Sequence, residues 1–229
     1  MQPQNHHAHA LRIATVLSVL SAVLLALVAA RWGPLTGADR DIVVPLHRVA
    51  LDHPGWTETN RVLTDWVWDP WTMRALTAAI VLWLLLRRER TLALWIVVTA
   101  ATGTALQQGV KALLDRPRPH WANPVDTAHY AAFPSGHALT ATVTFGLLLW
   151  LLKLHGAPAA WQRLATAVAA VSVLGVGLTR LYLGVHWPSD VLGGWLLGAT
   201  LVAWAAVFYP HPVIHRHERK SSSDGKVRP

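Results

Sequence analysis

The sequence has no cysteine, and charged residues make up only 14% of its 229 positions. Without cysteine the chain can form neither a disulfide, nor a thiolate metal site, nor a cysteine nucleophile, so several enzyme classes are excluded. Hydrophobic residues account for 53% of the chain, more than soluble proteins ordinarily use. The length is sufficient for one domain with a sizeable core. The scarcity of charge favours a membrane protein.

The net charge is +8 at pH 7, a value that by itself is compatible with nucleic-acid binding. In a nucleic-acid-binding protein, however, the basic residues would gather on a polar, soluble face. Here they interrupt apolar runs instead. We therefore expect no nucleic-acid partner.

Six apolar runs are candidates for membrane-spanning helices. At about 1.5 Å per residue, residues 11–30 reach roughly 30 Å, the thickness of the hydrocarbon core, and they contain one charge, Arg12. Three of the runs are short, about 15 residues, a length that buried helices of soluble proteins also have. The number of runs and the charges between them favour an all-α, polytopic bundle of about six transmembrane helices. The runs are residues 11–30, 73–86, 92–110, 138–152, 164–178 and 191–208.

The charges between these runs predict an orientation. With the N-terminus inside, the cytoplasmic stretches hold eleven basic and three acidic residues, whereas the outer stretches hold nine of each. The positive-inside rule therefore predicts N-in and C-in, and the turn 87–90, with its three arginines, supports this most directly. The alternative for residues 11–30 is a cleaved signal peptide, although their apolar core is longer than the usual roughly 7–15 residues.

Outside the expected spans, two segments differ in character. Residues 31–70 are rich in Trp, Asp and Pro, and we expect half-buried surface helices there, with tryptophans at the headgroup level. Residues 211–229 are polar and basic and are expected to be a disordered cytoplasmic tail, which leaves residues 1–210 as the membrane-embedded domain. Histidines cluster near both termini, where we interpret them as parts of solvated tails rather than metal ligands: His6, His7, His9, His211, His215 and His217.

Three polar clusters remain, and under the predicted topology each lies at the outer end of an apolar run. They occupy residues 111–119, 133–137 and 180–190. Together they contain cations, histidines and a carboxylate, which are the groups that phosphoryl transfer requires. Cations neutralise the phosphate oxygens, one side chain attacks phosphorus, and an acid protonates the departing oxygen. A site of this composition needs no metal ion.

The candidate phosphate-binding side chains are two arginines and a lysine. Arg118 and Arg180 can each hold two phosphate oxygens in a planar fork, and Lys111 supplies a point charge. A lone arginine at such a position is more often a base that snorkels to the interface, but three cations together favour anion binding. Ser135 and Gly136 precede an apolar helix. N-capping alone explains the serine, while the free N–H groups of this turn also suit a phosphate.

Two histidines are the candidates for acid and nucleophile. His137, protonated in the field of a bound phosphate, could donate to the leaving oxygen. His186 and Asp190 are four residues apart, with Pro188 suited to the first turn of a helix, so both side chains can lie on one side of the helix start. The carboxylate would fix one ring nitrogen and leave the other free to attack phosphorus. A His–Asp pair that only steadies a helix end is the structural alternative.

The order and spacing of these clusters resemble the three-part signature of the type 2 phosphatidic acid phosphatase superfamily. The motifs cover residues 111–190, and the six-span layout extends the resemblance over most of the chain. One departure is Thr179, where the family often has serine, and it affects only a minor phosphate contact. The matching parts are Lys111 with Arg118 and Pro119, residues 134–137, and Arg180 with His186 and Asp190.

The resemblance implies a role for each of these residues. His186 would be the nucleophile that forms a phosphohistidine, Asp190 its orienting carboxylate, and His137 the general acid. It also implies a metal-independent enzyme without cofactors, which agrees with the lack of a clustered carboxylate site in the sequence. The phosphate site would comprise Lys111, Arg118, Ser135, Gly136 and Arg180.

An active site on the outer face, beside the bilayer, predicts a lipid phosphate as substrate of a multi-pass protein in the bacterial plasma membrane. Undecaprenyl diphosphate, which is recycled outside that membrane, is the first choice, followed by phosphatidic acid and phosphatidylglycerol phosphate. The superfamily also includes vanadium haloperoxidases and soluble acid phosphatases, which the membrane spans disfavour. A different class of hypothesis is a non-catalytic, lipid-binding membrane protein that keeps the pocket.

Overall fold

Backbone amides and carbonyls find no water inside a bilayer, so an apolar chain of this kind satisfies them within helices. The computed structural model describes residues 3–209, with side chains from residue 7, and in that range it contains helices and no strand. This confirms the all-α fold class. The elements are α1 (Pro3–Ala29), α2 (Gly33–Asp52), α3 (Pro54–Val62), a π-helical turn η1 (Leu63–Val67), α4 (Pro70–Leu86), α5 (Arg90–Leu114), α6 (Gly136–Leu154), α7 (Ala159–Tyr182) and α8 (Pro188–Phe208).

Each of the six apolar runs lies almost entirely within one helix, namely α1 and α4 to α8. By length and composition, five segments of the described chain are able to cross a membrane. The predicted run 92–110 lies in α5, which is not among the five. That helix has 25 residues, but two adjacent glutamines and several threonines lower its apolar content. The five segments are His7–Ala29, Pro54–Leu86, Gly136–Leu154, Ala159–Tyr182 and Pro188–Phe208.

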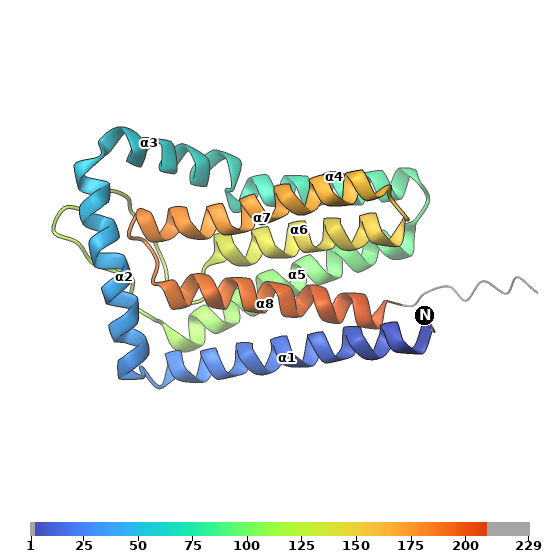
Figure 1. Cartoon of the computed structure of the whole chain (residues 1–229), viewed down its shortest axis with the longest axis horizontal. Coiled ribbons are helices and arrows are strands. Elements are labelled where there is room, and N and C mark those ends of the chain that lie inside the picture. Colours follow the sequence, from blue (N-terminus) through green and yellow to red (C-terminus); the bar gives the residue numbers. More distant parts are fainter. Residues whose placement is uncertain (1–2, 210–229) are drawn as a thin grey trace, which may run out of the picture.

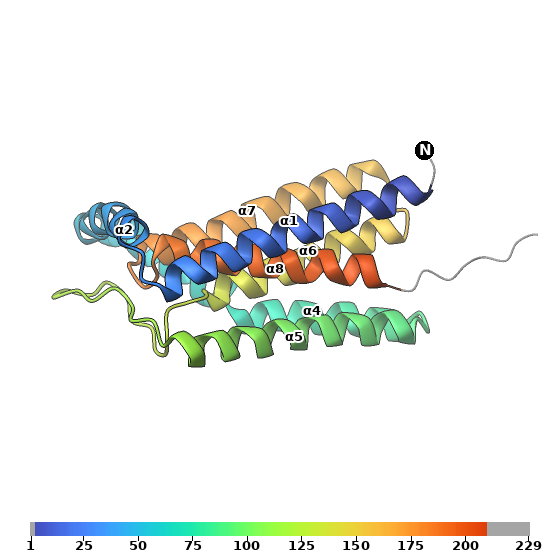
Figure 2. The same ribbon diagram turned by 90° about the horizontal axis from the view of Figure 1, so that it is seen from below.

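The long helices run alongside one another and form the body of the molecule (Figure 1). Helix α8 packs against both α1 and α6, while α4 and α5 form a pair below that layer in Figure 2. Helix α6 contacts α4, α5, α7 and α8, so it occupies the centre of the bundle. The apolar core around it includes Leu92 and Ile96 of α5 and Leu139, Val143 and Leu147 of α6.

Two glycines allow α8 to approach α6 closely. A Cβ at Gly194 would lie 2.7 Å from the carbonyl oxygen of Ser135, and one at Gly198 would lie 2.8 Å from Cβ of Thr142. The two backbones meet at these points because neither glycine has a side chain, and the four-residue spacing is typical of closely packed membrane helices. This contact fixes the beginning of α8 against the beginning of α6.

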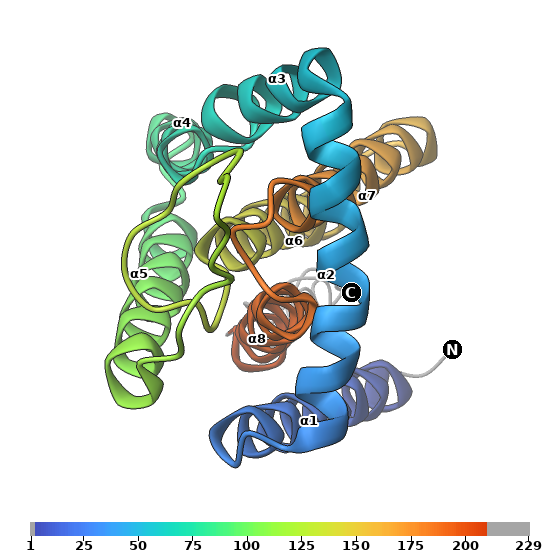
Figure 3. The same ribbon diagram turned by 90° about the vertical axis from the view of Figure 1, so that its left-hand side faces the viewer.

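One end of the bundle, here called the covered end, carries α2, α3 and the segment 115–135. Figure 3 views the molecule from this side and shows α2 crossing in front of the ends of the long helices. Helix α2 contacts both α7 and α8. Residues 31–70 therefore form helices across this end of the bundle, and their position at the membrane surface stays a prediction. Trp66 and Trp71 are 75% and 74% exposed, which suits tryptophans at the headgroup level.

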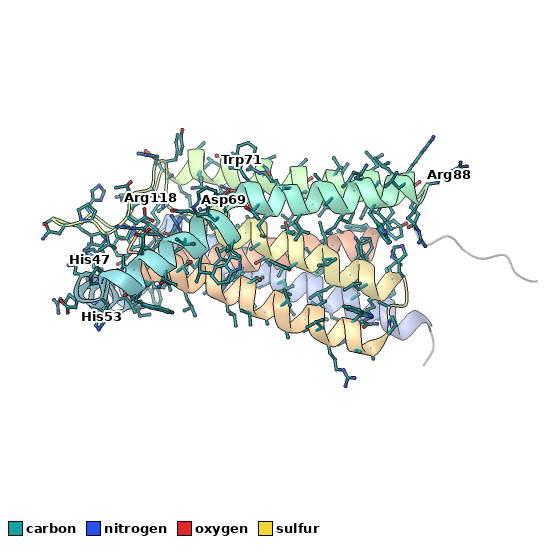
Figure 4. All side chains as sticks on the ribbon, turned by 90° about the horizontal axis from the view of Figure 1, so that it is seen from above. His47, His53, Asp69, Trp71, Arg88 and Arg118 are labelled. Carbon is teal, nitrogen blue, oxygen red and sulfur yellow. The ribbon has the colours of Figure 1, made fainter. Side chains whose placement is uncertain are left out.

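The opposite end carries the arginine-rich turn between α4 and α5. Figure 4 places Arg118 with His47 and His53 at the covered end and Arg88 at the other end. The beginning of α1 and the end of α8 also lie at the Arg88 end (Figure 1). The turn and the polar clusters are thus at opposite ends of the bundle, as the predicted topology requires. The N-in, C-in orientation itself stays a prediction.

The expected tail, residues 211–229, lies outside the described residues. The same holds for the side chains of His6, His211, His215 and His217. His7 and His9 belong to the first turns of α1, where both side chains are exposed.

Candidate active site

Helix direction brings the three polar clusters together at the covered end. Helices α5 and α7 end there, with Lys111 and Arg180 in their last turns. Helices α6 and α8 begin there, with His137 in the first turn of α6 and with His186 and Asp190 on either side of the beginning of α8. Antiparallel packing thus gathers residues that are distant in the sequence into one site.

His186 and Asp190 form a buried, hydrogen-bonded pair. Nδ1 of His186 lies 3.3 Å from Oδ2 of Asp190, and the backbone N–H of Trp187 donates to the same oxygen at 2.8 Å. The two side chains are 2% and 0% exposed. Helix α8 begins at Pro188, as expected from its position. The predicted arrangement on one side of the helix start is confirmed, and it leaves Nε2 on the other edge of the ring.

The second oxygen of Asp190 is held by an arginine. Nη1 of Arg116 donates to Oδ1 of Asp190 at 2.6 Å and to the hydroxyl of Ser189 at 2.7 Å, while Nη2 donates to Oδ2 of Asp39 at 2.7 Å. Asp39 also accepts from the backbone N–H and the hydroxyl of Ser189, at 2.9 and 2.6 Å. This Asp39–Arg116–Asp190 network is a buried set of alternating charges that ties α2 to the beginning of α8.

Arg118 faces the other side of the His186 ring. Its Nη1 lies 3.0 Å from Nε2 of His186 and donates to the carbonyl oxygen of Val185 at 2.7 Å. Its remaining nitrogens donate to backbone carbonyls of the segment 129–131, for example Nε to Tyr130 at 2.9 Å. Burial, followed by the nearby charge of Arg180, lowers the pKa of Arg118 to about 10. The guanidinium therefore keeps its charge at neutral pH.

The protonation of His186 follows from its surroundings. Burial, together with the positive charges of Arg118, Arg180 and Lys111, lowers the pKa of His186 well below its ordinary value. The ring is therefore neutral near pH 7. Its hydrogen-bond partners assign the proton to Nδ1, beside Asp190, and the lone pair to Nε2, beside Arg118. A neutral imidazole with one oriented lone pair is the form in which histidine acts as a nucleophile.

Lys111 and Arg180 contribute two further cations. Nζ of Lys111 donates to the carbonyl oxygen of Ala131 at 2.5 Å. Arg180 is only 4% exposed, and its Nη1 donates to the hydroxyl of Thr64 at 3.2 Å and lies 3.7 Å from Oδ2 of Asp126. Its Nε is buried and has no hydrogen-bond partner within the described chain. An unpaired buried donor is costly, so this atom is prepared for a partner that the protein does not supply.

The beginning of α6 completes the site. Ser135 is the N-cap of this helix, since its hydroxyl accepts from the backbone N–H of Ala138 at 3.5 Å, and the structural explanation for the serine therefore holds. Gly136 packs against α5, where a Cβ would lie 2.6 Å from Nε2 of Gln107. His137 follows and lies within electrostatic range of four predicted site residues: Arg180, His186, Arg118 and Lys111.

All eight site residues predicted from the sequence thus lie together at the covered end, and their chemical roles stay predictions. Sequence reasoning missed Asp39, Arg116 and Asp126. Arg116 stands in an Arg-Pro-Arg-Pro run beside Arg118, so residue type could not separate the two arginines. Asp39 lies 150 residues before Ser189 and is brought to the site only because α2 crosses the end of the bundle. No short-range pattern indicates that contact.

A cavity of about 550 Å³ opens beside the cluster. Arg118, Asp126 and Tyr130 line it, and Tyr130 is 90% exposed. The volume lies in the range of roughly 300–1,000 Å³ that is usual for small-molecule sites. Within residues 3–209, no group of three or more His, Asp or Glu side chains is arranged to hold a metal ion. Arg118 Nη1 lies 3.0 Å from Nε2 of His186, so the cavity has a cation that can attract an anion to this nitrogen.

Known proteins are similar to this chain in sequence and in fold. Residues 92–213 match the PAP2 superfamily. Phosphatidylglycerophosphatase B of Bacillus subtilis is 34% identical over 44% of this chain, and the match spans about half, 49%, of that relative's length. Decaprenylphosphoryl-5-phosphoribose phosphatase of Mycobacterium tuberculosis is 34% identical over 71% of this chain and 85% of its own. An undecaprenyl-diphosphatase of Sulfolobus acidocaldarius is 32% identical, with coverages of 59% and 60%.

The fold matches a solved structure as well. The crystal structure of a transmembrane PAP2 type phosphatidylglycerolphosphate phosphatase from Bacillus subtilis superposes with a TM-score of 0.74 and 25% sequence identity. The match covers 84% of this chain and 94% of that one. The family match extends over more than half of the chain and includes every predicted site residue. The resemblance seen in the three motifs is thereby confirmed, and the chain belongs to the PAP2 superfamily.

Proposed function

We propose that the protein is an integral membrane lipid phosphate phosphatase that works through a phosphohistidine intermediate. The observation that carries this proposal is the environment of His186: Nδ1 is held by Asp190 at 3.3 Å, and Nε2 faces the Arg118 guanidinium at 3.0 Å. A neutral imidazole held in this way presents its lone pair to an anion that the neighbouring cation attracts. Membership of the PAP2 superfamily and the phosphatase names of the relatives support the proposal.

Cations and helix N–H groups form the phosphate site. Lys111, Arg118 and Arg180 neutralise the phosphate oxygens, and the unpaired Nε of Arg180 gains an acceptor. The backbone N–H groups of Gly136 and His137, the first two residues of α6, have no partner within the described chain, and the start of a helix favours an anion. Ser135 supports this turn as the N-cap.

The reaction has two steps. In the first, Nε2 of His186 attacks phosphorus while the bond between phosphorus and the leaving oxygen breaks, and Asp190 stabilises the positive charge that develops on the ring. His137, protonated in the field of the bound phosphate, gives its proton to the leaving oxygen. In the second step, His137 takes a proton from water as the water oxygen attacks phosphorus, the P–N bond breaks, and inorganic phosphate leaves with His186 neutral again.

The substrate class follows from the position of the site at one end of an apolar bundle, where lipid headgroups meet water. Undecaprenyl diphosphate stays the first choice, because two of the relatives are named as phosphatases of polyprenyl lipids. Phosphatidylglycerol phosphate and phosphatidic acid are the alternatives. Phosphatidylglycerol phosphate has support from the two Bacillus subtilis comparisons, which carry its name.

We place the covered end on the extracytoplasmic face of the bacterial plasma membrane. The arginine-rich turn 87–90 lies at the opposite end of the bundle, and positive residues favour the cytoplasmic side. In this arrangement residues 1–210 are the membrane-embedded phosphatase domain and residues 211–229 are a cytoplasmic tail. The mechanism uses no metal ion and no cofactor, and nucleic acid has no part in it.

Phosphate release from purified, detergent-solubilised protein tests the proposal. The panel contains undecaprenyl diphosphate, phosphatidylglycerol phosphate and phosphatidic acid, each with and without a chelator. His186→Ala removes the nucleophile and should lower the release rate by at least about a thousandfold. His53→Ala is the matched control, since His53 is an exposed histidine at the same end of the bundle and should leave the rate unchanged. Quenching the reaction of labelled substrate with alkaline denaturant, which preserves the acid-labile P–N bond, should trap a phosphohistidine in the wild type only.

Each outcome separates the alternatives. Unchanged phosphate release by His186→Ala would contradict the assignment of His186 as the nucleophile. Loss of activity with the chelator contradicts the metal-free mechanism. A wild-type protein that binds these lipids but hydrolyses none of them is the non-catalytic lipid-binding protein. Among active outcomes, the lipid with the highest kcat/KM decides between the polyprenyl and glycerophospholipid substrates.

A further inference from the structure

A second cavity, of about 330 Å³, lies between the end of α1, the beginning of α2 and the end of α5. It shares only Arg116 and Pro117 with the lining of the active-site cavity, so most of its lining is separate. Because its lining differs from that of the active site, the proposed phosphatase reaction does not account for it.

One wall of this second cavity is apolar. Val28 and Ala29 come from the last turn of α1, and Leu113 and Leu114 from the last turn of α5. Leu113 is 84% exposed, which is unfavourable in water but natural for a side chain beside lipid. The candidate span His7–Ala29 ends at this cavity. Leu113 is therefore the exposed part of the apolar wall, whereas Val28 is only 6% exposed and belongs to the packed core.

The other wall is cationic. Arg31, Arg40 and Arg116 line the cavity, with Asp39 as its only carboxylate. Both terminal nitrogens of Arg116 are already bonded within the Asp39–Arg116–Asp190 network. Arg31 and Arg40 differ from it: both are exposed, and neither side chain has a hydrogen bond or ion pair with any residue of the described chain. Two positive charges thus face the cavity without an anion.

The backbone at Arg31 gives an independent indication. The N–H of Trp32 donates to Leu27 and that of Arg31 to Val28, the bonding pattern of a helix end whose left-handed residue is usually glycine. Here that residue is Arg31, with φ of +50°. A side chain in this conformation is disfavoured, and such outliers concentrate at sites of function. The strained conformation marks Arg31 as a candidate functional residue, although Arg88 at the end of α4 has the same geometry, with φ of +63°.

We propose that this cavity binds the headgroup phosphate of an anionic glycerophospholipid, with the acyl chains against Val28, Leu113 and Leu114. Arg31 and Arg40 supply the charge, and the apolar wall selects a lipid over a free phosphate ion. Basic pockets between transmembrane helices are known to hold anionic headgroups. Arg31 and Arg40 take no part in the proposed reaction, so occupancy of this site does not depend on whether the protein hydrolyses phosphate.

Thermal unfolding of the full chain in detergent tests the site. Short-chain phosphatidylglycerol is titrated, and its apparent dissociation constant is taken from the dependence of Tm on lipid concentration. Phosphatidylcholine with the same chains controls for the acyl chains, and glycerol 1-phosphate controls for the headgroup. We expect phosphatidylglycerol to stabilise the protein more than either control.

Charge-removing variants locate the site. Affinity for phosphatidylglycerol should fall roughly fivefold in Arg31→Gln or Arg40→Gln and about 30-fold in the double variant. Arg48→Gln is the matched control, because Arg48 is an exposed arginine of α2 that does not line the cavity, and it should keep wild-type affinity. His186→Ala should also keep it, because His186 does not line this cavity. Each variant is melted without lipid, and the single variants decide if the double variant is unstable.

Several results would overturn the proposal. Equal stabilisation by phosphatidylcholine would mean that the headgroup charge is not recognised, and equal stabilisation by glycerol 1-phosphate would mean that the site takes a free phosphate. Wild-type affinity in the double variant would show that Arg31 and Arg40 only extend toward the interface. An equal loss in Arg48→Gln would indicate a general surface attraction, and a loss in His186→Ala would place the lipid in the active site.

Discussion

Replacing Arg116 by methionine tests the Asp39–Arg116–Asp190 network. The Arg116 side chain is 12% exposed, that of Asp39 3% and that of Asp190 0%, so water screens these charges little. Methionine keeps an apolar side chain in place but removes the guanidinium, which leaves two buried carboxylates without their cation. Breaking a buried ion pair from one side costs roughly 3–5 kcal/mol. We expect Arg116→Met to lower the free energy of unfolding by about that amount.

The same substitution should disturb the reaction. Without Arg116, only the Trp187 N–H and the His186 ring still hold Asp190, both through Oδ2, so the carboxylate is free to rotate. In a catalytic triad, replacing the orienting aspartate by asparagine lowers kcat on the order of 10⁴-fold. Groups that only position such a residue typically contribute on the order of 10–100-fold. We therefore expect kcat to fall roughly 10–100-fold. KM should change little, because both terminal nitrogens of Arg116 bind Asp39, Asp190 and Ser189 and do not face Nε2 of His186.

The assay combines thermal unfolding in detergent with steady-state phosphate release. Glu58→Gln is the control, because it breaks the exposed Arg61–Glu58 pair and should cost at most about 1 kcal/mol. Adding Asp39→Asn to Arg116→Met neutralises one of the two unpaired carboxylates. The double variant should therefore be more stable than Arg116→Met alone, although Asp39→Asn destabilises the wild type.

Three results would refute this reasoning about Arg116. If Arg116→Met is no less stable than Glu58→Gln, the network does not stabilise the fold. If kcat is unchanged, Arg116 does not position Asp190. If the loss appears in KM with kcat preserved, Arg116 binds the substrate phosphate directly and is not a positioning residue.

Three further predictions concern protonation, phosphate binding and packing. The pKa of His186 in the folded protein lies below the ordinary value of 6.5, so only the unfolded chain takes up a proton on this ring as the pH falls through 6.5. The free energy of unfolding should therefore decrease toward acid by up to about 1.4 kcal/mol per pH unit, and Tm should decrease with it. The part of the pH dependence that His186 causes should be absent in His186→Asn. A pH profile of Tm in that variant that equals the wild-type profile would contradict the assignment. Arg118→Lys keeps a charge but loses the planar fork and should lower kcat/KM roughly 10–100-fold, so wild-type kcat/KM in a release assay would argue against a bidentate grip. Gly194→Ala brings a Cβ within 2.7 Å of the Ser135 carbonyl oxygen and should lower the free energy of unfolding by about 1–3 kcal/mol, as measured by melting. Gly109→Ala is the control, because a Cβ there would have nothing within 4 Å, and it should not destabilise the protein. Equal effects of the two substitutions would show that the close approach at Gly194 is unimportant.

Local features of this fold could be predicted from the sequence because they depend on neighbouring residues. The apolar runs became helices, Ser135 became an N-cap, and Pro188 began α8. The pairing of His186 with Asp190 follows from the same local geometry, since four residues bring both side chains to one side of a helix start. The motifs also placed the other candidate residues at helix ends. Antiparallel packing of the helices then brings these ends together at one end of the bundle.

Contacts made across the end of the bundle could not be predicted in this way. Asp39 reaches Arg116 and Ser189 only because α2 crosses in front of α8, and no period or motif encodes that crossing. The partners of Arg180 present the same difficulty, since Thr64 and Asp126 come from separate segments that fold over its guanidinium. Sequence reasoning therefore named the residues that we propose bind phosphate and missed residues that contact them across the end of the bundle.

Lys111 and Arg118 form no ion pair within the described chain, and a phosphate would supply the negative charge that they lack. Burying several cations near one another costs free energy, and Lys111 and Arg118 are compensated partly by carbonyl oxygens of the segment 129–131. That segment includes Tyr130, which is 90% exposed, so its carbonyl contacts are among the easiest in the site to exchange. A phosphate can replace them and satisfy Nε of Arg180 as well. Asp190 need not move, because the buried network anchors it from the opposite side. The site thus combines cations that can change partners with a proposed nucleophile that is held in place, which is the division that phosphoryl transfer to a histidine requires.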